Sequence, residues 1–205
     1  MRRLSLVIGV SLIISASLAY GQENAGAGRF EISALPAGAV LFTSSDNGAE
    51  PEFGNYVLGG SFTYNFNRWI GFEAEAGSLV GVHQTLDFNS YTLSDQHTPD
   101  MFAYTGNVAV SPWGSSRRFV PFVTGGLGGL TMFDSQEVAN LGITSSTTFL
   151  TGNVGGGAKW FANRTWGVRG DYRFMMVDGK ASAPAFFGQS SRYGHRVTGG
   201  LVLTY

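Results

Sequence analysis

The sequence contains no cysteine among its 205 residues, which excludes disulfide bonds between its loops and lipid attachment to a cysteine. Charged residues are scarce, at 13%, and nearly balanced, with 13 Lys and Arg against 14 Asp and Glu. This balance excludes the basic character of a nucleic-acid-binding protein. Beyond the N-terminal region no stretch approaches the roughly 18 apolar residues of a membrane helix, so helical spans are also excluded.

The single apolar run lies at the N-terminus, from Leu4 to Leu18, after Arg2 and Arg3. A basic start, a short apolar middle and a small-residue end are typical of a secretory signal peptide. A membrane anchor is the competing interpretation, but about 15 apolar residues fall short of the roughly 20 that a span needs. We expect residues 1–19 to be a signal peptide, with cleavage possible as late as residue 21, and residues 20–205 to form one domain.

Strand-forming and turn-forming residues dominate the rest of the chain, and the full sequence is rich in Gly (30), Phe (16) and Tyr (8). Eight segments alternate between apolar and polar or small residues, each near the length of a tilted transmembrane strand: Arg29–Phe42, Tyr56–Phe66, Trp69–Val82, Met101–Val110, Phe119–Met132, Thr148–Phe161, Trp166–Met175 and Tyr193–Tyr205. The alternation is least clear in 119–132. We therefore expect an all-β fold, an eight-stranded antiparallel up-and-down transmembrane β-barrel.

Short and long connections alternate between these segments. The short ones span 67–68, 111–118 and 162–165, and the long ones span 43–55, 83–100, 133–147 and 176–192. Outer-membrane barrels have this layout, with short turns in the periplasm and long loops outside. The four tryptophans lie at or beside the short turns, as expected of an aromatic girdle at a membrane interface: Trp69, Trp113, Trp160 and Trp166.

The two kinds of connection also differ in charge. The short turns carry arginines and no acidic residue: Arg68, Arg117, Arg118 and Arg164. The long loops carry nine acidic residues against only Lys180 and Arg192. The charges of the connections therefore separate by side, which supports the barrel layout.

Charges inside the predicted strands keep to one face. A charge facing lipid at mid-depth costs about 2–4 kcal/mol for Arg or Lys, so this face is expected to line the lumen. The third and seventh strands lie on opposite walls, so their arginines should reach Glu73 or Glu75 across the lumen. The expected lumen ionic network has four charges of each sign: Glu31, Glu73, Glu75, Asp171, Lys159, Arg169, Arg173 and Arg196. In the competing interpretation these charges are solvated by interior water and do not pair.

Several segments carry a resemblance to a known family: Asn67–Glu75, Pro121–Gly128, Gly155–Phe161 and Val168–Phe174, with the aromatic end Tyr205. In these segments the chain resembles the small OmpA-type outer-membrane β-barrel family, which includes the OmpX/Ail-like and opacity-type proteins. The resemblance covers the whole mature chain and implies the outer membrane of a Gram-negative bacterium. Larger members continue into a peptidoglycan-binding domain, whereas this sequence stops at Tyr205, so cell-wall anchoring is not expected. The last strand looks like the family's assembly signal, with outward residues Val197, Leu201, Leu203 and Tyr205.

No catalytic, cofactor or metal site is expected. None of the histidines, His83, His97 and His195, has a Ser two residues on, which barrel deacylases of similar size require. A Ser-His-acid site built from loops stays open, since such triads are defined by geometry. The glycine runs 126–129 and 155–157 precede no helix, so we expect them to make room for large side chains in the lumen.

Two long loops contain further candidate residues. Loop 83–100 holds a possible cation cluster whose spacing matches no known motif, so a solvated acidic loop is favoured: His83, Asp87, Asp95, His97 and Asp100. Its segment 85–93 could extend the barrel as a hairpin. Loop 176–192 holds Phe186 and Phe187, which form either a contact patch for a partner or packing against the barrel rim.

An eight-stranded barrel is just wide enough to be filled by side chains, so a general diffusion pore is not expected. The expected function is a structural or surface-interaction role, in adhesion or membrane integrity, through the long loops. The alternative is a narrow channel or transporter for small or apolar solutes, as in OmpW-like relatives, and a lipid-modifying enzyme is less favoured. Expected partners are outer-membrane lipid and lipopolysaccharide, the assembly machinery and an extracellular surface partner. The protein is expected to be a monomer.

Overall fold

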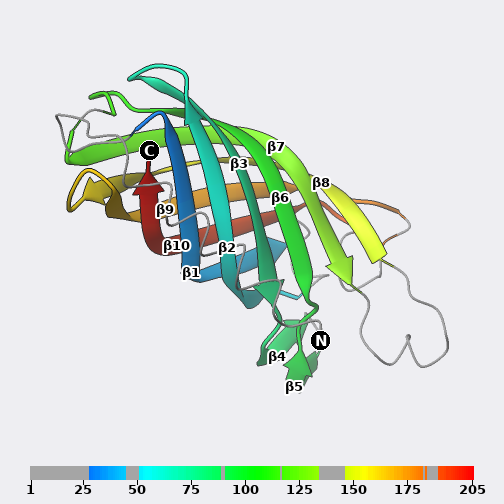
Figure 1. Ribbon diagram of the computed structural model, residues 1–205. Helices are drawn as coiled ribbons and strands as arrows, with labels where there is room; N and C mark the ends of the chain where they lie inside the picture. The colour runs from blue at the N-terminus through cyan, green and yellow to red at the C-terminus, as the bar shows by residue number, and fades with distance from the viewer. Residues whose placement is uncertain are drawn as a thin grey trace, which may run out of the picture.

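The computed structural model describes residues 28–44, 51–88, 91–115, 117–133, 146–181, 183 and 189–205. Eight strands form a closed barrel (Figure 1): β1 (Phe30–Ser44), β2 (Phe53–Asn65), β3 (Ile70–Val80), β6 (Met101–Val110), β7 (Phe119–Phe133), β8 (Ser146–Phe161), β9 (Trp166–Val177) and β10 (Arg192–Thr204). All neighbours pair antiparallel, and β1 closes the ring against β10. The predicted fold is confirmed, and the strand ends differ from the predicted ends by at most three residues.

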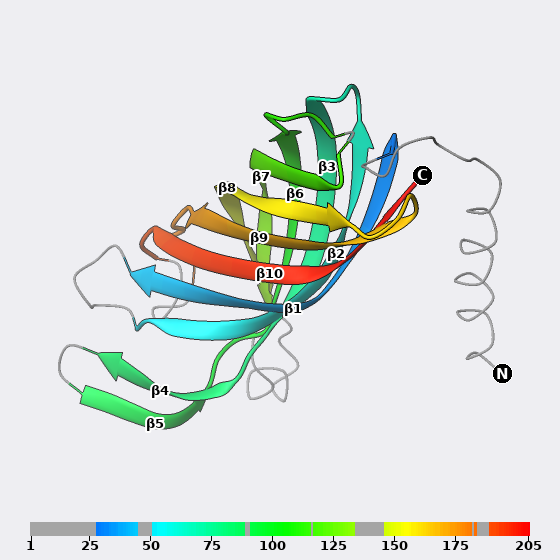
Figure 2. The same cartoon turned by 90° about the vertical axis from the view of Figure 1, so that its left-hand side faces the viewer.

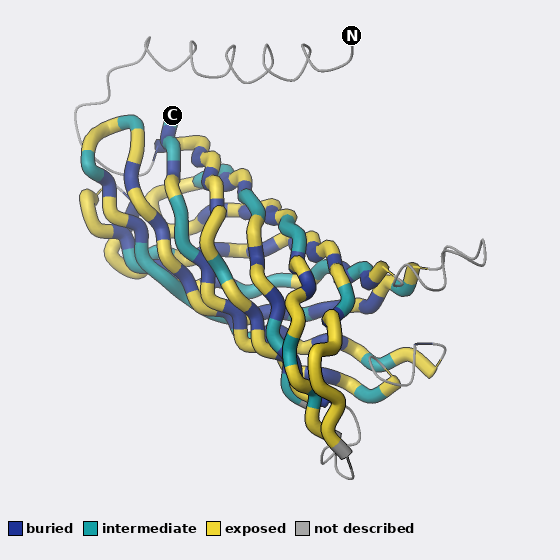
Figure 3. The backbone as a smooth tube through the Cα atoms, turned by 90° about the horizontal axis from the view of Figure 1, so that it is seen from below, coloured by how far each residue is buried: buried dark blue, intermediate teal, exposed yellow. Residues whose placement is uncertain are grey.

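Buried and exposed residues alternate along the strands of the barrel (Figure 3), as expected when successive side chains point to the interior and to the outer face. In β6 every second residue is buried, from Met101 onward. The outer face is largely apolar, with Val123 57% and Leu127 67% exposed, as expected of a surface that contacts lipid tails. In β7 the even-numbered residues point inward, because Phe122 and Thr124 are buried while Val123 and Leu127 are exposed. The alternation left unclear by the sequence of 119–132 is therefore present.

Strand β1 contains a bulge that the sequence analysis does not predict. Its register shifts between Ala34 and Ala37 against β10 and between Leu35 and Ala39 against β2. Pro36 lies within this stretch and has no N–H to donate to a neighbouring strand. The bulge reverses the inward face from odd-numbered residues before it to even-numbered residues after it. The Tyr56 hydroxyl on β2 donates a hydrogen bond to the Pro36 carbonyl, which compensates part of the lost pairing.

Glycine on β8 leaves space beside the buried charges. Gly157 points inward, and a Cβ atom added to it would stand 2.6 Å from the Cβ of Asp171 on β9. The space it leaves is taken by the neighbouring strand, which differs from the expected role of admitting side chains from the opposite wall. Among the described residues no helix is long and apolar enough to cross a membrane.

Beyond the end of the barrel opposite the C-terminus, β4 (His83–Phe88) and β5 (Tyr91–His97) form a separate two-stranded hairpin (Figure 2). The predicted hairpin in this loop is thus present, although it does not continue the barrel sheet. Its base is tied to β2 by the Gln84 side chain, whose Nε2 donates to the Gly54 carbonyl at 2.8 Å and whose Oε1 accepts from Gly54 N at 3.1 Å.

Candidate functional site

The charged residues of the barrel interior are divided between two halves of its wall. The acidic half carries Glu31 on β1 with Glu73 and Glu75 on β3, and the basic half carries Lys159 on β8, Arg169 and Arg173 on β9 and Arg196 on β10. Asp171 is the one acid of this set on the basic half. All eight side chains are at most 5% exposed. The fold therefore sets opposite charges against each other across the lumen.

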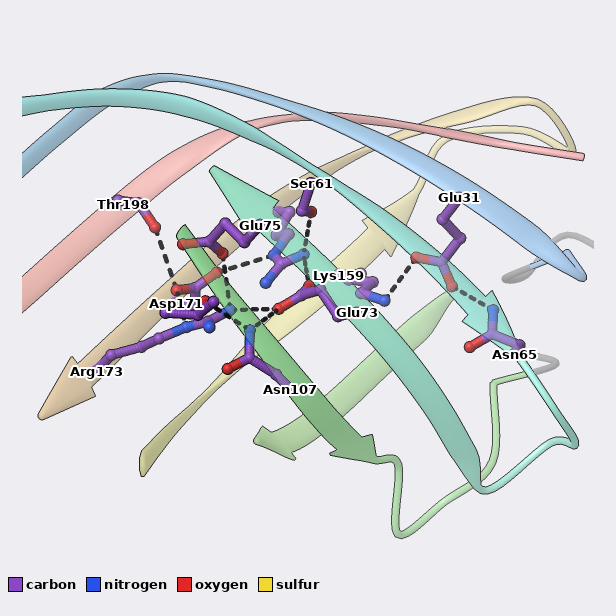
Figure 4. A network of polar contacts seen from close by, with 12 residues as sticks. Glu31, Ser61, Asn65, Glu73, Glu75, Asn107, Lys159, Asp171, Arg173 and Thr198 are labelled. Atoms are coloured by element: carbon purple, nitrogen blue, oxygen red, sulfur yellow. Dashed lines mark hydrogen bonds and ion pairs between the residues drawn. The ribbon is translucent and has the colours of Figure 1, made fainter. Parts of the chain in front are cut away.

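Six of these residues form one group, here called the central cluster: Glu73, Glu75, Arg169, Asp171, Arg173 and Arg196. Its centre is Glu73, which accepts from two arginines of the opposite wall (Figure 4). Arg169 Nη1 lies 2.5 Å from Glu73 Oε2, and Arg173 Nη2 lies 2.6 Å from Glu73 Oε1. Strands β3 and β9 stand four places apart in the ring of eight, so these contacts span the lumen.

The remaining contacts of the central cluster pair every charge in it. Arg173 Nη2 also lies 2.9 Å from Glu75 Oε2, and Arg196 pairs with the other oxygen of Glu75. The two oxygens of Asp171 accept from Arg169 Nε at 2.8 Å and from Arg173 Nε at 3.3 Å. Each carboxylate thus meets two guanidinium groups, and the charge-assisted hydrogen bonds among these contacts are about twice as strong as neutral ones.

The other two charges form a separate pair, in which Lys159 Nζ lies 2.5 Å from Glu31 Oε2. Asn65 Nδ2 donates to the second oxygen of Glu31 at 2.6 Å. The ring of Phe122 on β7 stands between this pair and the central cluster, with Lys159 Nζ 5.2 Å and Arg169 Cζ 5.0 Å from its centroid. The negative face of an aromatic ring attracts cations, so Phe122 links the two groups.

Neutral polar side chains extend the network, although Arg169 Nη2 and Arg196 Nε remain buried without a hydrogen-bond partner among the described residues. Asn107 Nδ2 donates to Glu73 at 3.3 Å, and Asn153 Nδ2 donates to Asn107 Oδ1 at 2.9 Å. Ser61 Oγ accepts from Arg169 at 3.1 Å, and Thr198 Oγ1 donates to Asp171 at 3.1 Å. The sequence analysis predicts none of these, nor Phe122. The register of strand pairing could have identified two of them. Asn107 is the direct cross-strand partner of Glu73, and Thr198 is the direct cross-strand partner of Asp171.

Apolar side chains fill the interior on both sides of the charges. At the end that carries the hairpin, one buried cluster comprises Val40, Phe42, Phe53, Val57, Leu79, Met101, Ala103, Leu130, Met132, Phe149, Val177 and Ala183. A smaller one at the short-turn end comprises Val120, Phe161 and Val202. The sequence analysis does not predict either cluster. They shield the ion pairs from water, which strengthens the electrostatic interactions between them.

This shielding makes the network costly to break. Taking an ion out of water costs several kcal/mol, which pairing and hydrogen bonding offset. Removing one partner leaves an uncompensated charge, a loss of about 3–5 kcal/mol. The ion pairs of the central cluster therefore hold β3 to β9 and β10 across the lumen.

The other predicted residues lie apart from this network. The four tryptophans are exposed, by 41% to 57%, and all lie at the short-turn end: Trp69, Trp113, Trp160 and Trp166. Of the predicted assembly signal, Val197 and Leu201 are exposed on the outer face, and Leu203 and Tyr205 are partly exposed. Phe186, Phe187 and the predicted signal peptide fall outside the described residues.

The possible cation cluster of the hairpin region, which the sequence disfavoured against a solvated acidic loop, is not assembled. His83 Nδ1 lies 3.0 Å from Asp95 Oδ1, but Asp100 accepts from Gly81 N and Asp87 accepts from Thr92. In the described part of the chain no group of three or more His, Asp or Glu side chains is placed to hold a metal ion. His195 is exposed on the outer face, where Tyr172 Oη lies 2.8 Å from its Nδ1.

The comparisons with known proteins agree with this architecture. In sequence, the model of the outer membrane protein beta-barrel domain matches residues 6–197, whereas no curated protein matches the chain. In structure, the chain is similar to Neisserial surface protein A, with a TM-score of 0.63 and 13% identity over 88% of this chain and 99% of that one. It is also similar to the outer membrane protein OprG from Pseudomonas aeruginosa, with a TM-score of 0.52 and 19% identity over 89% and 98% of the two chains. Since the family model spans almost the whole sequence, the chain belongs to the outer membrane protein beta-barrel domain family.

Proposed function

We propose that this protein is a closed, non-conducting and non-catalytic barrel of the outer membrane that presents its long loops for surface interaction, in adhesion or membrane integrity. The observation that carries the proposal is the interior, where opposite walls are joined by Glu73 with Arg169 and Arg173. An eight-stranded barrel leaves no spare width beside such side chains.

Conduction would require these pairs to separate. An ion entering from either end would first meet the apolar clusters and then the paired charges. Parting a buried, hydrogen-bonded pair costs about 3–5 kcal/mol per partner lost, and several pairs would have to part together. The resting barrel is therefore proposed to be closed.

The proposed orientation puts the short turns in the periplasm and the hairpin of β4 and β5 outside the cell. The long loops support it, because they are extracellular in barrels of this kind. The tryptophans at the short-turn end mark that end as a membrane interface. The hairpin is then a described part of the surface available to a partner, with exposed Asp87, Thr92 and Leu93.

One observation favours the alternative, a narrow route for small or apolar solutes. The inner wall at the hairpin end is apolar, with Phe42, Phe53 and Phe149 among its buried residues. Such a wall suits an apolar guest. In the structure these side chains pack against one another, so a guest would have to displace them.

Single-channel recording in planar lipid bilayers tests the proposal. The purified protein should give no stable conductance, whereas an E73Q/E75Q variant, which leaves three arginines without their main partners, should conduct intermittently. Uptake of a small fluorescent apolar dye into vesicles addresses the alternative. Stable conductance of the unmutated protein, or dye uptake that depends on it, would overturn the closed-barrel proposal.

A further inference from the structure

Two short turns at the end of the barrel where the C-terminus lies are joined into one surface (Figure 1). The turn between β2 and β3 and the turn between β6 and β7 share backbone hydrogen bonds. Ser115 N donates to the Arg68 carbonyl at 2.7 Å, and Ser111 N donates to the Trp69 carbonyl at 2.8 Å. Gly114, at φ +77, bends the second turn onto Arg68 in a backbone conformation that glycine adopts readily. The two turns therefore form a fixed unit.

This unit exposes three arginines and three aromatic rings, here called the turn patch: Arg68, Trp69, Trp113, Arg117, Arg118 and Phe119. All six are exposed, with Trp113 57% and Phe119 49% exposed. The guanidinium carbon of Arg68 lies 4.8 Å from the ring centre of Trp69, and the rings of Trp113 and Phe119 are 6.4 Å apart. One arginine thus lies against an aromatic ring, and two further rings lie close to each other in the same unit.

The charge of the turn patch is not balanced locally. Among the described residues of the two turns and the strand ends beside them, no Asp or Glu is exposed. Arg117 and Arg118 are adjacent in the chain and repel each other. The lumen charges, by contrast, are paired with one another and play no part here. A site with several fixed cations and no acidic residue is complementary to an anion.

The turn patch is continuous with the surface that faces the membrane. Ile70 and Phe72 follow it on β3, and Val110 precedes it on β6, and all three are exposed on the outer face. A ligand held there would contact apolar wall on one side and arginines on the other. A soluble anion would use only the arginines, whereas a phospholipid would use both.

We propose that the turn patch binds the phosphate headgroup of an anionic phospholipid, with its acyl chains lying along Ile70, Phe72 and Val110. Arginine presents paired N–H donors that match phosphate oxygens, and the ring of Trp69 holds one guanidinium at the level of the interface. In the proposed orientation this is the periplasmic leaflet. The inference rests on that orientation only for the choice of leaflet, and binding itself is tested in symmetric bilayers.

The test is native mass spectrometry of the full chain released from nanodiscs that contain equal amounts of phosphatidylglycerol and phosphatidylcholine. The unmutated barrel should retain phosphatidylglycerol preferentially. An R68Q/R117Q/R118Q variant should lose this preference, since each arginine near a membrane surface contributes about five-fold in affinity for anionic lipid. An R68K/R117K/R118K variant should keep part of it. Gel electrophoresis verifies that each variant is folded, because a folded barrel migrates differently before and after boiling in detergent.

An R29Q/R164Q variant is the matched control, because it removes two exposed arginines of the same barrel end outside the turn patch. It should lose less of the preference for phosphatidylglycerol than the triple Gln variant, because two arginines outside the turn patch act only through the general attraction of about five-fold each. Equal retention of the two lipids by the unmutated protein, or equal loss of the preference in the control and in the triple Gln variant, would overturn the proposal. Retention by the unmutated protein of a soluble polyanion such as heparin in place of phosphatidylglycerol would identify a soluble partner and overturn it as well.

Discussion

Lys159 and Arg169 face each other as direct cross-strand partners on β8 and β9, and both are buried cations. Like charges directly opposite each other in a sheet are destabilising. Here the ring of Phe122 receives both cations, and each has its own carboxylate, Glu31 for Lys159 and Glu73 for Arg169. Lys159 and Arg169 can therefore be neighbours, because Phe122 on β7 contacts both and the carboxylates of Glu31 and Glu73 balance their charges.

The first prediction concerns that ring. F122L should lower the free energy of unfolding more than F161L, by about 1–2 kcal/mol, since two cation–π contacts are lost in addition to apolar area. Phe161 is also fully buried in the interior, in the small apolar cluster at the short-turn end, which makes F161L the matched control. Urea unfolding in lipid vesicles, followed by tryptophan fluorescence, gives both values. Equal destabilisation by the two substitutions would show that Phe122 acts only as apolar filling.

The second prediction concerns the room that glycine leaves beside the network. G157A should destabilise the barrel by about 1–3 kcal/mol, because the added Cβ would stand 2.6 Å from Asp171 Cβ and force a shift in β9. G170A is its control on the adjacent strand, where the nearest atom to an added Cβ is 3.9 Å away. It should have little effect in the same unfolding measurement. A neutral G157A would mean that the interior is loosely packed at this point.

The sequence was sufficient to predict the barrel, because alternation is strict where lipid contacts the other face. Arg169, Asp171 and Arg173 are separated by apolar outward residues, so their face could be deduced from β9 alone. Contact of these arginines with Glu73 or Glu75 was expected from the positions of the two strands, but the pairing of Arg173 with both carboxylates depends on the register of strands far apart in the chain. Pairing across the lumen is a property of the closed ring.

Other features were hidden because both faces of a strand are apolar. Phe122 lies between Pro121 and Val123, so the composition of that stretch does not distinguish inside from outside. The same holds for Val40 and Phe42 in β1, which belong to the apolar cluster at the hairpin end. The bulge at Pro36 reverses the inward face within one strand, which a continuous alternating pattern does not reveal.

The third prediction concerns assembly. Y205D should reduce the amount of folded protein in the outer membrane strongly while leaving secretion across the inner membrane intact. Tyr205 and Phe30 exchange backbone hydrogen bonds at 2.9 and 3.2 Å, so this residue stands at the seam between β10 and β1. The fraction of the protein that shifts on boiling, measured in isolated outer membranes, reports assembly.

N163D provides the control for this experiment. It adds the same charge at the same barrel end and keeps the side-chain oxygen that accepts from Thr165 N and Trp166 N. It should assemble normally. Normal levels of Y205D in the outer membrane would refute the proposed role of Tyr205 in assembly.

A double-mutant cycle between Glu73 and Arg169, whose charged atoms are 2.5 Å apart across the lumen, tests most directly whether charges on opposite walls are paired. The free energies of unfolding of E73Q, R169M and the double variant should give a coupling of about 1–3 kcal/mol, because residues in one ion-pair network are not additive. A parallel cycle between E73Q and D87N, in the exposed hairpin, should be additive. Strict additivity in the first cycle would contradict the account and show that the interior charges do not pair.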